Sequence, residues 1–435
     1  TFDQNFKFLI PITIILIPAF LGIFYGLITL CFIISKPKKI VSSFFSFSLF
    51  FGIFEFIRGS ILTGFPWNLI AYSFSNHLEI LSITSFIGTY GFNLFCISLF
   101  TSPAVFILRD SKKDIWVCIV FLMMPLLFYM HGSSYKETFN TSDVISYNYK
   151  VRAIGSNISL DRFYSNIDPA SAINDLIEIS EPNKNEKTIF VWPEGILPEI
   201  SQKELFEYKW LFEKSFNKNH LLLIGINNQT INKESINYFN SLSIYDHNLE
   251  LLNFYNKVNL VPFGEFLPFE NISKAFGLRS ITNNYQSFSK GNKREIMEIN
   301  REGFSIKILP LICYEIIYSG KIFSNSNFDL IINISEDGWF GKSIGPKQHF
   351  AHSIFRAVES GKYLLRSANN GIAAIINPLG IVEQKVEYGK SGYVDFKEAK
   401  KIQPTLFAKY GNKIFITLIL LYIFIIFSFN RIKNE

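Results

Sequence analysis

The segment Lys307-Ile308-Leu309-Pro310-Leu311-Ile312-Cys313-Tyr314-Glu315 is a mostly apolar run that ends in a thiol, an aromatic ring and a carboxylate. A short apolar run of this kind, bounded by Gly303 and a polar turn, is typical of a core strand in an α/β sheet. Reactive groups in such sheets lie just past the carboxyl ends of the strands, so Cys313 is predicted to stand at a sheet edge. A thiol in that place is either a small buried hydrophobe or a nucleophile, and other parts of the chain have to distinguish the two.

The block from about residue 150 to 400 alternates short apolar runs with amphipathic stretches, which predicts an α/β domain. The predicted strands are Val151–Ile154, Thr188–Trp192, Leu221–Ile224, Leu242–Tyr245, Leu251–Tyr255, Ser305–Ile312, Leu330–Ile334, Tyr363–Arg366, Ile372–Ile376 and Ile381–Val386. The predicted helices include Ala170–Ile179, Lys203–Phe216 and Lys347–Gly361. Residues 271–300, rich in Ser, Asn and Lys, predict a long loop over the domain, of the kind that serves as a lid.

Five other stretches are hydrophobic and nearly free of charge. They run from about Phe8 to Ile34, Val41 to Ile57, Leu81 to Leu108, Ile115 to Met130 and Ile414 to Phe429. Stretches of about this length cross a bilayer as α-helices. We therefore predict a transmembrane helical region at 1–131, an extramembrane α/β domain at 132–411, and a last transmembrane helix with a short tail at 412–435.

Basic residues flank these stretches at Lys36–Lys39, Lys112–Lys113 and Arg431–Lys433. Loops rich in Lys and Arg stay in the cytoplasm, so the α/β domain is predicted on the opposite, extracytoplasmic face of the membrane. The chain opens on Thr1, directly before a hydrophobic stretch and without the start of a signal peptide, so we expect further residues to precede it.

The hydrophobic content and the net charge of the chain limit the kinds of function that it can have. Hydrophobic residues make up 49% and aromatic residues 17% of the 435 residues, which fits one large core plus a membrane region. The net charge is +6, but the lysines are dispersed and form no basic helix, so no nucleic-acid partner is predicted.

Three of the four cysteines lie inside hydrophobic stretches, namely Cys31, Cys96 and Cys118. Cys313 is therefore the one thiol of the α/β domain, and no disulfide is available to that domain. The six histidines show no zinc-ligand spacing with Cys313, so the sequence predicts no metal and no cofactor.

Between the second and third hydrophobic stretches the sequence reads Glu55-Phe56-Ile57-Arg58-Gly59 and then Gly64-Phe65-Pro66-Trp67-Asn68. Glu55 and Arg58 are three residues apart on a predicted helix, so we expect them to pair at the membrane boundary. The segment is then either an interfacial anchor with Trp67 in the aromatic belt, or a contact for lipid headgroups beside the extracytoplasmic domain.

Three polar residues follow predicted strands: Glu194 after Thr188–Trp192, Lys257 after Leu251–Tyr255, and Cys313. A carboxylate, an amine and a thiol are sufficient for acyl transfer. The thiolate is the nucleophile, and Glu194 is a candidate for the base that takes its proton. Lys257 and a backbone N–H beside Cys313 are candidates for stabilising the oxyanion of the tetrahedral intermediate.

Several longer motifs accompany these residues. They are Glu55-Phe56-Ile57-Arg58-Gly59 with Phe65-Pro66-Trp67, Lys257-Val258-Asn259-Leu260-Val261-Pro262-Phe263-Gly264-Glu265, Cys313-Tyr314-Glu315, and Asn333-Ile334-Ser335-Glu336-Asp337-Gly338-Trp339-Phe340-Gly341. With these motifs the chain resembles the nitrilase superfamily, and within it the membrane branch of apolipoprotein N-acyltransferases. The resemblance covers nearly the whole chain.

The resemblance implies an αββα sandwich inserted in a transmembrane helical bundle, with Glu194, Lys257 and Cys313 as the catalytic triad. It further implies supporting roles for Glu265, Tyr314 and Glu315, and a loop near the lipid entrance that carries Trp339 and Phe340. Tyr164 stands, in ungapped register, where the family has Trp, and Glu336 where it more often has Asn. The family carries eight spans, so about three are expected to precede this chain.

The activity implied by the resemblance is transfer of an acyl chain from a phospholipid onto Cys313 and then onto the α-amine of a lipoprotein's diacylglyceryl-cysteine. The implied place is a bacterial inner membrane, with the catalytic domain in the periplasm. An alternative enzyme is a membrane-anchored nitrilase-type amidase, in which water replaces the amine. A transporter or a non-catalytic scaffold is a third possibility, but it predicts charges buried along several spans, and these spans carry few besides Glu55 and Arg58.

Overall fold

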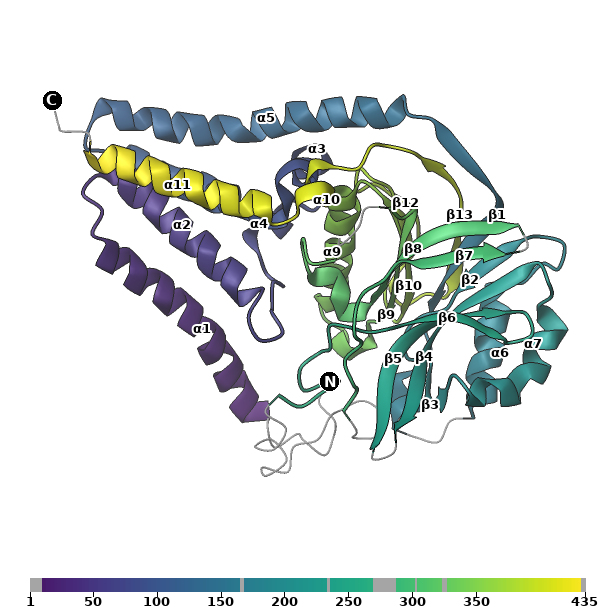
Figure 1. Cartoon of the computed structure of the whole chain (residues 1–435). Coiled ribbons are helices and arrows are strands. Elements are labelled where there is room, and N and C mark those ends of the chain that lie inside the picture. Colours follow the sequence, from purple (N-terminus) through teal and green to yellow (C-terminus); the bar gives the residue numbers. More distant parts are fainter. Residues whose placement is uncertain are drawn as a thin grey trace.

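The computed structural model describes residues 10–164, 168–232, 235–268, 287–301, 303–322 and 327–431. These residues form a bundle of long helices and a domain built on a large β-sheet (Figure 1). The long helices extend from one side of the sheet domain, and helices α6 (Pro169–Ser180) and α7 (Lys209–Ser215) lie on its opposite side.

The helical part contains five helices that are long and apolar enough to cross a membrane within the described residues. They are α1 (Ile10–Ser35), α2 (Ile40–Arg58), α4 (Thr84–Leu108), α5 (Ile115–Asn140) and α11 (Lys413–Arg431). Shorter helices connect them: η2 (Ile70–Phe74), α3 (Leu78–Leu81), η3 (Lys112–Asp114) and α10 (Leu406–Tyr410). The five predicted hydrophobic stretches are therefore confirmed as helices.

Helices α2, α4 and α11 pack through a common apolar core. Phe45 of α2, Leu94 of α4 and Tyr422 of α11 are all buried there, because each helix is apolar around most of its circumference. Helix α5 runs as one helix from Ile115 past the predicted domain limit at residue 131 to Asn140, and strand β1 (Val144–Ser156) begins four residues later.

The sheet domain contains thirteen described strands. After β1 they are β2 (Thr188–Val191), β3 (Leu197–Ser201), β4 (His220–Asn232), β5 (Ser235–Asp246), β6 (Leu251–Asn256), β7 (Met297–Arg301), β8 (Phe304–Ile312), β9 (Leu330–Glu336), β10 (Tyr363–Asn369), β11 (Ala373–Ile376), β12 (Val382–Val386) and β13 (Gly392–Lys400). Their order along the main path is β6-β5-β4-β2-β1-β10-β9-β8-β7.

Two halves of this sheet face one another across a shared core. β1 joins them, because it pairs in parallel with β2 over four residues and with β10 over only two. Side chains of alternate residues from both halves fill the space between, among them Val191 and Leu223 from one half and Ile332 and Leu365 from the other.

Helices cover the two outer faces of the sandwich. Phe190 of β2 points outward onto Ile173 of α6 and Phe212 of α7. On the other face, Ile331 of β9 packs in one cluster with Phe355 of α9 (Gly345–Ser360), and helix α4 of the membrane part joins this cluster. The layers are therefore helix, sheet, sheet and helix, and the predicted αββα sandwich is confirmed.

All ten predicted strands and all three predicted helices overlap observed elements. Three observed strands were not predicted. Strands β3 and β13 carry charged residues inside their apolar pattern. Strand β7 begins inside the predicted 271–300 loop, so the loop prediction is wrong for residues 297–300. The part of the loop at 271–286 lies outside the described residues.

The strands that carry the site point in one direction. Strands β1, β2, β4, β8, β9 and β10 pair in parallel, and β6 runs the same way because two antiparallel pairings separate it from β4. Their carboxyl ends therefore meet at one edge of the sandwich, where side chains that follow the strands come together.

Candidate active site

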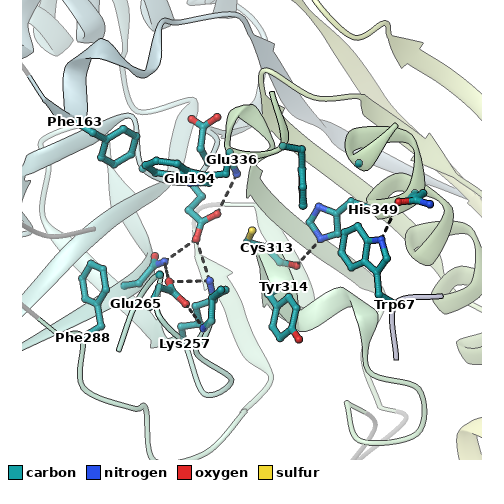
Figure 2. Close-up of a pocket in the computed structure, with 18 of the residues that line it drawn as sticks. Trp67, Phe163, Glu194, Lys257, Glu265, Phe288, Cys313, Tyr314, Glu336 and His349 are labelled. Carbon is teal, nitrogen blue, oxygen red and sulfur yellow. Dashed lines mark hydrogen bonds and ion pairs between the residues drawn. The ribbon is translucent and has the colours of Figure 1, made fainter. Parts of the chain in front are cut away.

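Cys313 lies directly after β8 and opens the short helix η6 (Cys313–Ile317). Its backbone has a φ of 48°, a left-handed conformation that costs a non-glycine residue about 1–3 kcal/mol. Such strain persists only where surrounding contacts hold it. The left-handed conformation at Cys313 turns the chain sharply from strand β8 into helix η6. The turn leaves the thiol at the end of the strand, as the sequence predicted (Figure 2).

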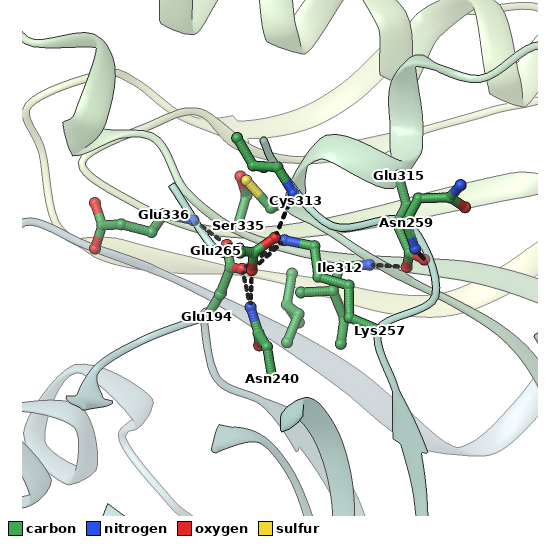
Figure 3. A network of polar contacts seen from close by, with 12 residues as sticks. Glu194, Asn240, Lys257, Asn259, Glu265, Ile312, Cys313, Glu315, Ser335 and Glu336 are labelled. Atoms are coloured by element: carbon green, nitrogen blue, oxygen red, sulfur yellow. Dashed lines mark hydrogen bonds and ion pairs between the residues drawn. The ribbon is translucent and has the colours of Figure 1, made fainter. Parts of the chain in front are cut away.

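A buried cluster of two carboxylates, an ammonium and an amide faces the thiol (Figure 3). The Lys257 ammonium donates to Glu265 Oε1 at 2.9 Å and to Glu194 Oε1 at 3.2 Å. Asn240 Nδ2 donates to the same two oxygens, at 2.6 Å to Glu194 and 2.8 Å to Glu265. The second Glu194 oxygen accepts the backbone N–H of Glu336 at 3.0 Å. Glu194 is therefore fixed through both oxygens.

The charges of this cluster determine its protonation. Burial alone lowers the pKa of Lys257, but the negative charges of Glu194 and Glu265 outweigh burial and hold that pKa well above its ordinary value. Burial raises the pKa of Glu265, with Lys257 opposing the rise. Lys257 is therefore a permanent cation that two carboxyl groups share.

The thiol itself is not ionised in the resting site. Burial raises the pKa of Cys313 well above its ordinary value, and the charge of Glu194 raises it further, while Lys257 and a hydrogen bond with Ser335 lower it. For Cys313 to act as a nucleophile, a nearby base therefore has to take the proton of its thiol. Glu194 lines the same cavity as the thiol, and its negative charge acts on the thiol, so it is the candidate for that base.

Glu315 holds two of the strand ends together. Its Oε1 accepts the backbone N–H groups of Val258 and Asn259, both at 3.0 Å, and its Oε2 accepts that of Ile312 at 2.9 Å. Arg294 and Tyr255 also donate to Oε1, at 2.6 and 2.8 Å. One fully buried carboxylate thus fixes the residues next to Lys257 and next to Cys313 relative to one another.

A second polar group lies on the other side of Cys313, and the sequence analysis did not identify it. Nδ1 of the buried His349 on α9 lies 2.9 Å from Asp337 Oδ1, and Nε2 lies 3.3 Å from the Cys313 carbonyl oxygen. Arg366 Nη2 donates to both oxygens of Asp337, at 2.9 and 2.8 Å. Burial raises the pKa of Asp337, but Arg366 and His349 outweigh burial and bring it well below the ordinary range. The ionised Asp337 anchors the imidazole against the backbone of the strained turn.

The backbone N–H of Glu336 bonds to Glu194, and the Glu336 side chain holds neighbouring residues in place. The carboxylate forms an ion pair with Arg162 and accepts Asn369 Nδ2 at 2.7 Å and Gly338 N at 2.8 Å. These bonds fix the start of the loop that carries Trp339, and the Glu336 N–H that orients Glu194.

A cavity of about 590 Å³ opens above the thiol and is lined mainly by apolar atoms. Glu194, Lys257, Glu265, Cys313 and Tyr314 line it, as predicted for site residues. Aromatic rings form much of its remaining wall: Phe65, Trp67, Phe163, Phe288, Trp339 and Phe340. The predicted pair Trp339 and Phe340 is among them.

Two of these aromatic residues come from the membrane part. Phe65 and Trp67 lie in the loop after α2, with their rings stacked at 6.3 Å, and Trp67 also lies against Phe340 at 5.3 Å. Trp67 Nε1 donates to Gln348 Oε1 of α9 at 2.9 Å (Figure 2).

The expected ion pair of Glu55 and Arg58, one helix turn apart on α2, is confirmed, with an N–O distance of 3.0 Å. Arg58 in turn donates to Phe65 O at 2.9 Å, so the ion pair holds the loop that bears both rings.

Tyr164 is not among the residues that line this cavity, and its side chain is half exposed. Its neighbour Phe163 lines the cavity instead and lies 4.8 Å from Trp339, ring centre to ring centre. The aromatic surface that the resemblance implies is thus present one residue earlier, because the short helix η4 (Leu160–Phe163) directs residue 163 inward. Glu315 does not line the cavity either, and acts from behind it.

Within the described ranges no group of three or more His, Cys, Asp or Glu side chains is arranged to hold a metal ion. The chemistry that the side chains themselves offer is nucleophilic: a thiol, a fixed carboxylate and a fixed cation at the base of an apolar cavity.

Two protein families match the chain. Residues 2–100 match the apolipoprotein N-acyltransferase N-terminal domain, and residues 176–394 match the carbon-nitrogen hydrolase family. The first match lies within the helical part and the second covers most of the sandwich.

Curated relatives match over most of the chain. An apolipoprotein N-acyltransferase of Rickettsia bellii is 30% identical over 99% of this chain and 84% of its own length. The enzyme of that name from Rhodopseudomonas palustris is 28% identical, over 94% of this chain and 77% of its own length. Among solved structures, an amidase from Nesterenkonia sp. AN1 aligns with 58% of this chain and 91% of its own, at 14% identity and a TM-score of 0.39.

Proposed function

Because the chain belongs to the apolipoprotein N-acyltransferase family, we propose that it acylates the N-terminal S-diacylglyceryl-cysteine of apolipoproteins, with a phospholipid as acyl donor and Cys313 as carrier. One observation supports this proposal above the others. The cavity over Cys313 has a largely apolar wall, and part of that wall is the loop of a membrane helix. A fatty acyl chain leaving the bilayer fits this wall, whereas a small water-soluble amide has no need of it.

In the first half-reaction Glu194 takes the proton of the Cys313 thiol as the sulfur attacks an ester carbonyl of the phospholipid. Lys257 stabilises the negative oxygen of the tetrahedral intermediate. The carbon–oxygen bond of the ester then breaks, the glycerol oxygen takes the proton back from Glu194, and lysophospholipid leaves. Cys313 remains as a thioester.

In the second half-reaction the α-amine of the lipoprotein's lipidated cysteine attacks the thioester carbonyl. Glu194 accepts a proton from the amine, the carbon–sulfur bond breaks, and the sulfur regains a proton from Glu194. An amide forms, and the site returns to its starting state. The amine and the phospholipid use the same carbonyl position in turn, so the reaction is ping-pong.

Water has to be kept from the thioester between these steps. Trp67 packs against Phe340 and Phe163 packs against Trp339, and all four rings line the cavity that contains Cys313. Excluding water in this way favours transfer to an amine over hydrolysis. The membrane-anchored amidase is therefore the less favoured function, since it requires an open path for water.

The proposal includes the orientation and the division of the chain. Residues 132–411 form the catalytic domain in the periplasm, between a helical region at 1–131 and a last helix and tail at 412–435 in a bacterial inner membrane. Reporter fusions after about residue 250 test the orientation. A fusion that reports a cytoplasmic location contradicts the proposed acceptor, because the acceptor matures on the outer face of that membrane.

The acylation itself is tested by intact-mass measurement. Protein incubated with phospholipid alone is expected to gain one hydroxylamine-sensitive acyl group, which is lost when a diacylglyceryl peptide with a free α-amine is added. The variant Cys313→Ala should gain none. Steady release of free fatty acid without a retained acyl group would support the amidase instead.

A further inference from the structure

A second cavity, of about 470 Å³, lies beside the catalytic one. Its described lining residues come from the loop after α2, from the segment after β6 and from the helix η6 that follows Cys313. They are Ser60, Leu62, Thr63, Val258, Asn259, Leu260, Phe266, Leu267, Ser287, Phe288, Lys290, Tyr318 and Lys321.

The polar groups in this lining are mostly hydrogen-bond donors. Two lysines, Lys290 and Lys321, contribute positive charge, and no Asp or Glu is among the described lining residues. Hydroxyl groups come from Ser60, Thr63 and Ser287. Such a surface suits an anion whose oxygens only accept hydrogen bonds.

Part of this donor capacity is unused. Ser60 Oγ is buried and has no hydrogen-bond partner among the described residues. Lys321 donates to the Ser60 carbonyl oxygen at a long 3.3 Å, and its ammonium lies 5.5 Å from the Tyr318 ring centre. Burial lowers the pKa of Lys321, which an anion in the cavity would reverse. A buried hydroxyl without a partner is costly, so a ligand group or an ordered water is expected beside Ser60.

The cavity lies directly after the end of membrane helix α2, and this position favours the phosphate group of a lipid as the anion. Membrane helix α2 ends at Arg58, and Ser60 and Thr63 follow within five residues. The apolar side chains between them, Ile61 and Leu62, are 45% and 74% exposed, as expected for a loop tip that touches lipid. The ends of spanning helices lie at the headgroup layer of the bilayer, which is where phosphate groups lie.

The cavity also adjoins the reacting thiol. Phe288 lines both cavities, and Leu260 and Val261, neighbours in the chain, line one each. Tyr314 lines the catalytic cavity and Tyr318 the second one, with ring centres 5.5 Å apart. A glycerophospholipid carries a phosphodiester and, a few bonds away, acyl esters, so one molecule reaches both places.

We propose that the cavity between the loop after α2 and helix η6 binds the phosphodiester of the donor phospholipid, through Lys290, Lys321 and the Ser60 hydroxyl, while its ester lies at Cys313. This inference rests on the proposed function and adds the part of the donor that the site recognises. It assigns the lysines to binding, not to the chemical step. Removing them therefore raises the KM for phospholipid and leaves kcat unchanged.

The test compares two donors with the same acyl chains. Dioleoylphosphatidylglycerol carries the phosphodiester as its only charge, and dioleoylglycerol lacks it. In neutral detergent, Lys290→Ala with Lys321→Ala should raise the KM for the phospholipid about tenfold or more, the scale of one lost charge-assisted hydrogen bond. The KM for dioleoylglycerol should stay the same. Lys218→Ala, on the exposed turn before β4, is the charge-matched control and should change neither value.

Restored affinity in Lys290→Arg with Lys321→Arg would support the role of charge. An unchanged KM for the phospholipid in the alanine variant would overturn the inference, and so would equal losses with both donors, which would indicate a structural role. Sodium phosphate, compared with sodium chloride at equal ionic strength, separates a lipid phosphodiester from free phosphate. Displacement of the donor by millimolar phosphate would assign the cavity to free phosphate instead.

A measurement without turnover makes the result independent of the proposed function. Cys313→Ala protein should retain dioleoylphosphatidylglycerol in native mass spectra, and the two lysine replacements should remove that retention. If neither donor acylates the peptide, the proposed function fails, while this binding comparison still tests the cavity. Equal retention with and without the lysines overturns the inference.

Discussion

The phenol of Tyr314 donates a 2.7 Å hydrogen bond to the carbonyl oxygen of Gly64. Tyr314 is the residue next to the nucleophile, and Gly64 lies in the loop that follows membrane helix α2. Tyr318 repeats the contact one turn later, with a 2.6 Å bond to the Thr63 carbonyl oxygen. The turn that carries Cys313 is thus bonded to the membrane part, so the thiol and the aromatic wall from the α2 loop keep one relative position.

Replacing Tyr314 by Phe tests this link. The ring stays in the cavity wall, but the Gly64 carbonyl loses its donor, a change that costs about 1–3 kcal/mol when a buried group is left unpaired. We expect the rate of Cys313 acylation by phospholipid to fall about tenfold or more. Single-turnover mass measurements give this rate.

Tyr149→Phe is the matched control for Tyr314→Phe. It removes a 2.6 Å bond to the Ser305 carbonyl at the opposite end of β8 and should not change the acylation rate. Equal rates in Tyr314→Phe and the wild type would show that the link does not position the thiol.

The two charged members of the proposed triad should each be needed for rate. Glu194→Gln keeps the shape of the side chain but replaces one of its two accepting oxygens with an NH2 group and removes the base, so acylation should slow by about a hundredfold or more. Lys257→Met removes the cation that faces the oxyanion and should slow it comparably. The measurement is the rate of thioester formation on Cys313. Glu298→Gln, at an exposed position of strand β7, is the control, and near-normal rates in either site variant would exclude that residue from the mechanism.

The sequence predicted the three triad candidates because each follows a strand, and parallel strands end at one edge. Asn240, which touches both Glu194 and Glu265, was not predictable in this way, because it lies inside β5 and its direction depends on a register that the sequence does not reveal. His349 reads as an ordinary polar residue of an amphipathic helix.

The aromatic wall was predicted only in part for a related reason. In the sequence, Trp67 fits an interfacial anchor as well as a site residue. Its contact with Gln348 joins residues 281 positions apart, so no local pattern indicates it. Such a contact depends on how the membrane helices meet the sandwich, and local patterns carry no information on that. The exchange of Tyr164 for Phe163 is a shift of one residue in a short helix, which lies within the uncertainty of any local pattern.

The pKa of Cys313 should shift in opposite directions when Glu194 and Lys257 are replaced. Burial raises the pKa of the thiol, the negative charge of Glu194 raises it further, and Lys257 lowers it. Glu194→Gln should therefore move the midpoint pH of Cys313 alkylation downward, and Lys257→Met should move it upward. The Glu194 variant would then alkylate faster at a given pH while it transfers the acyl group more slowly. The rate of iodoacetamide modification, followed on the Cys313 peptide across pH, measures both shifts. Shifts of the same sign in the two variants would contradict this electrostatic arrangement.

Glu315 should contribute stability that depends on pH. Burial raises the pKa of its carboxyl, but the charge of Arg294 and the backbone N–H groups of Ile312 and Asn259 outweigh burial and hold that pKa below its ordinary value. A lowered pKa in the folded state stabilises the protein above the ordinary carboxyl pKa, and this stability is lost as the pH falls through the folded value. Near neutral pH, Glu315→Gln should therefore cost about 3 kcal/mol, because Arg294 is left buried without its partner.

The difference between wild type and Glu315→Gln should shrink in acid, since protonated Glu315 resembles the amide. Thermal unfolding midpoints in detergent, measured for both proteins from about pH 7 to below about pH 4, show the trend. Glu383→Gln is a suitable control, because that carboxylate lies in β12 and, among the described residues, accepts hydrogen bonds only from Asn377 and Tyr363. A midpoint difference that stays constant across this range would mean that Glu315 acts through its shape rather than its charge. It would then brace Lys257 and Cys313 by packing alone, and the acylation rate of the variant should remain close to that of the wild type.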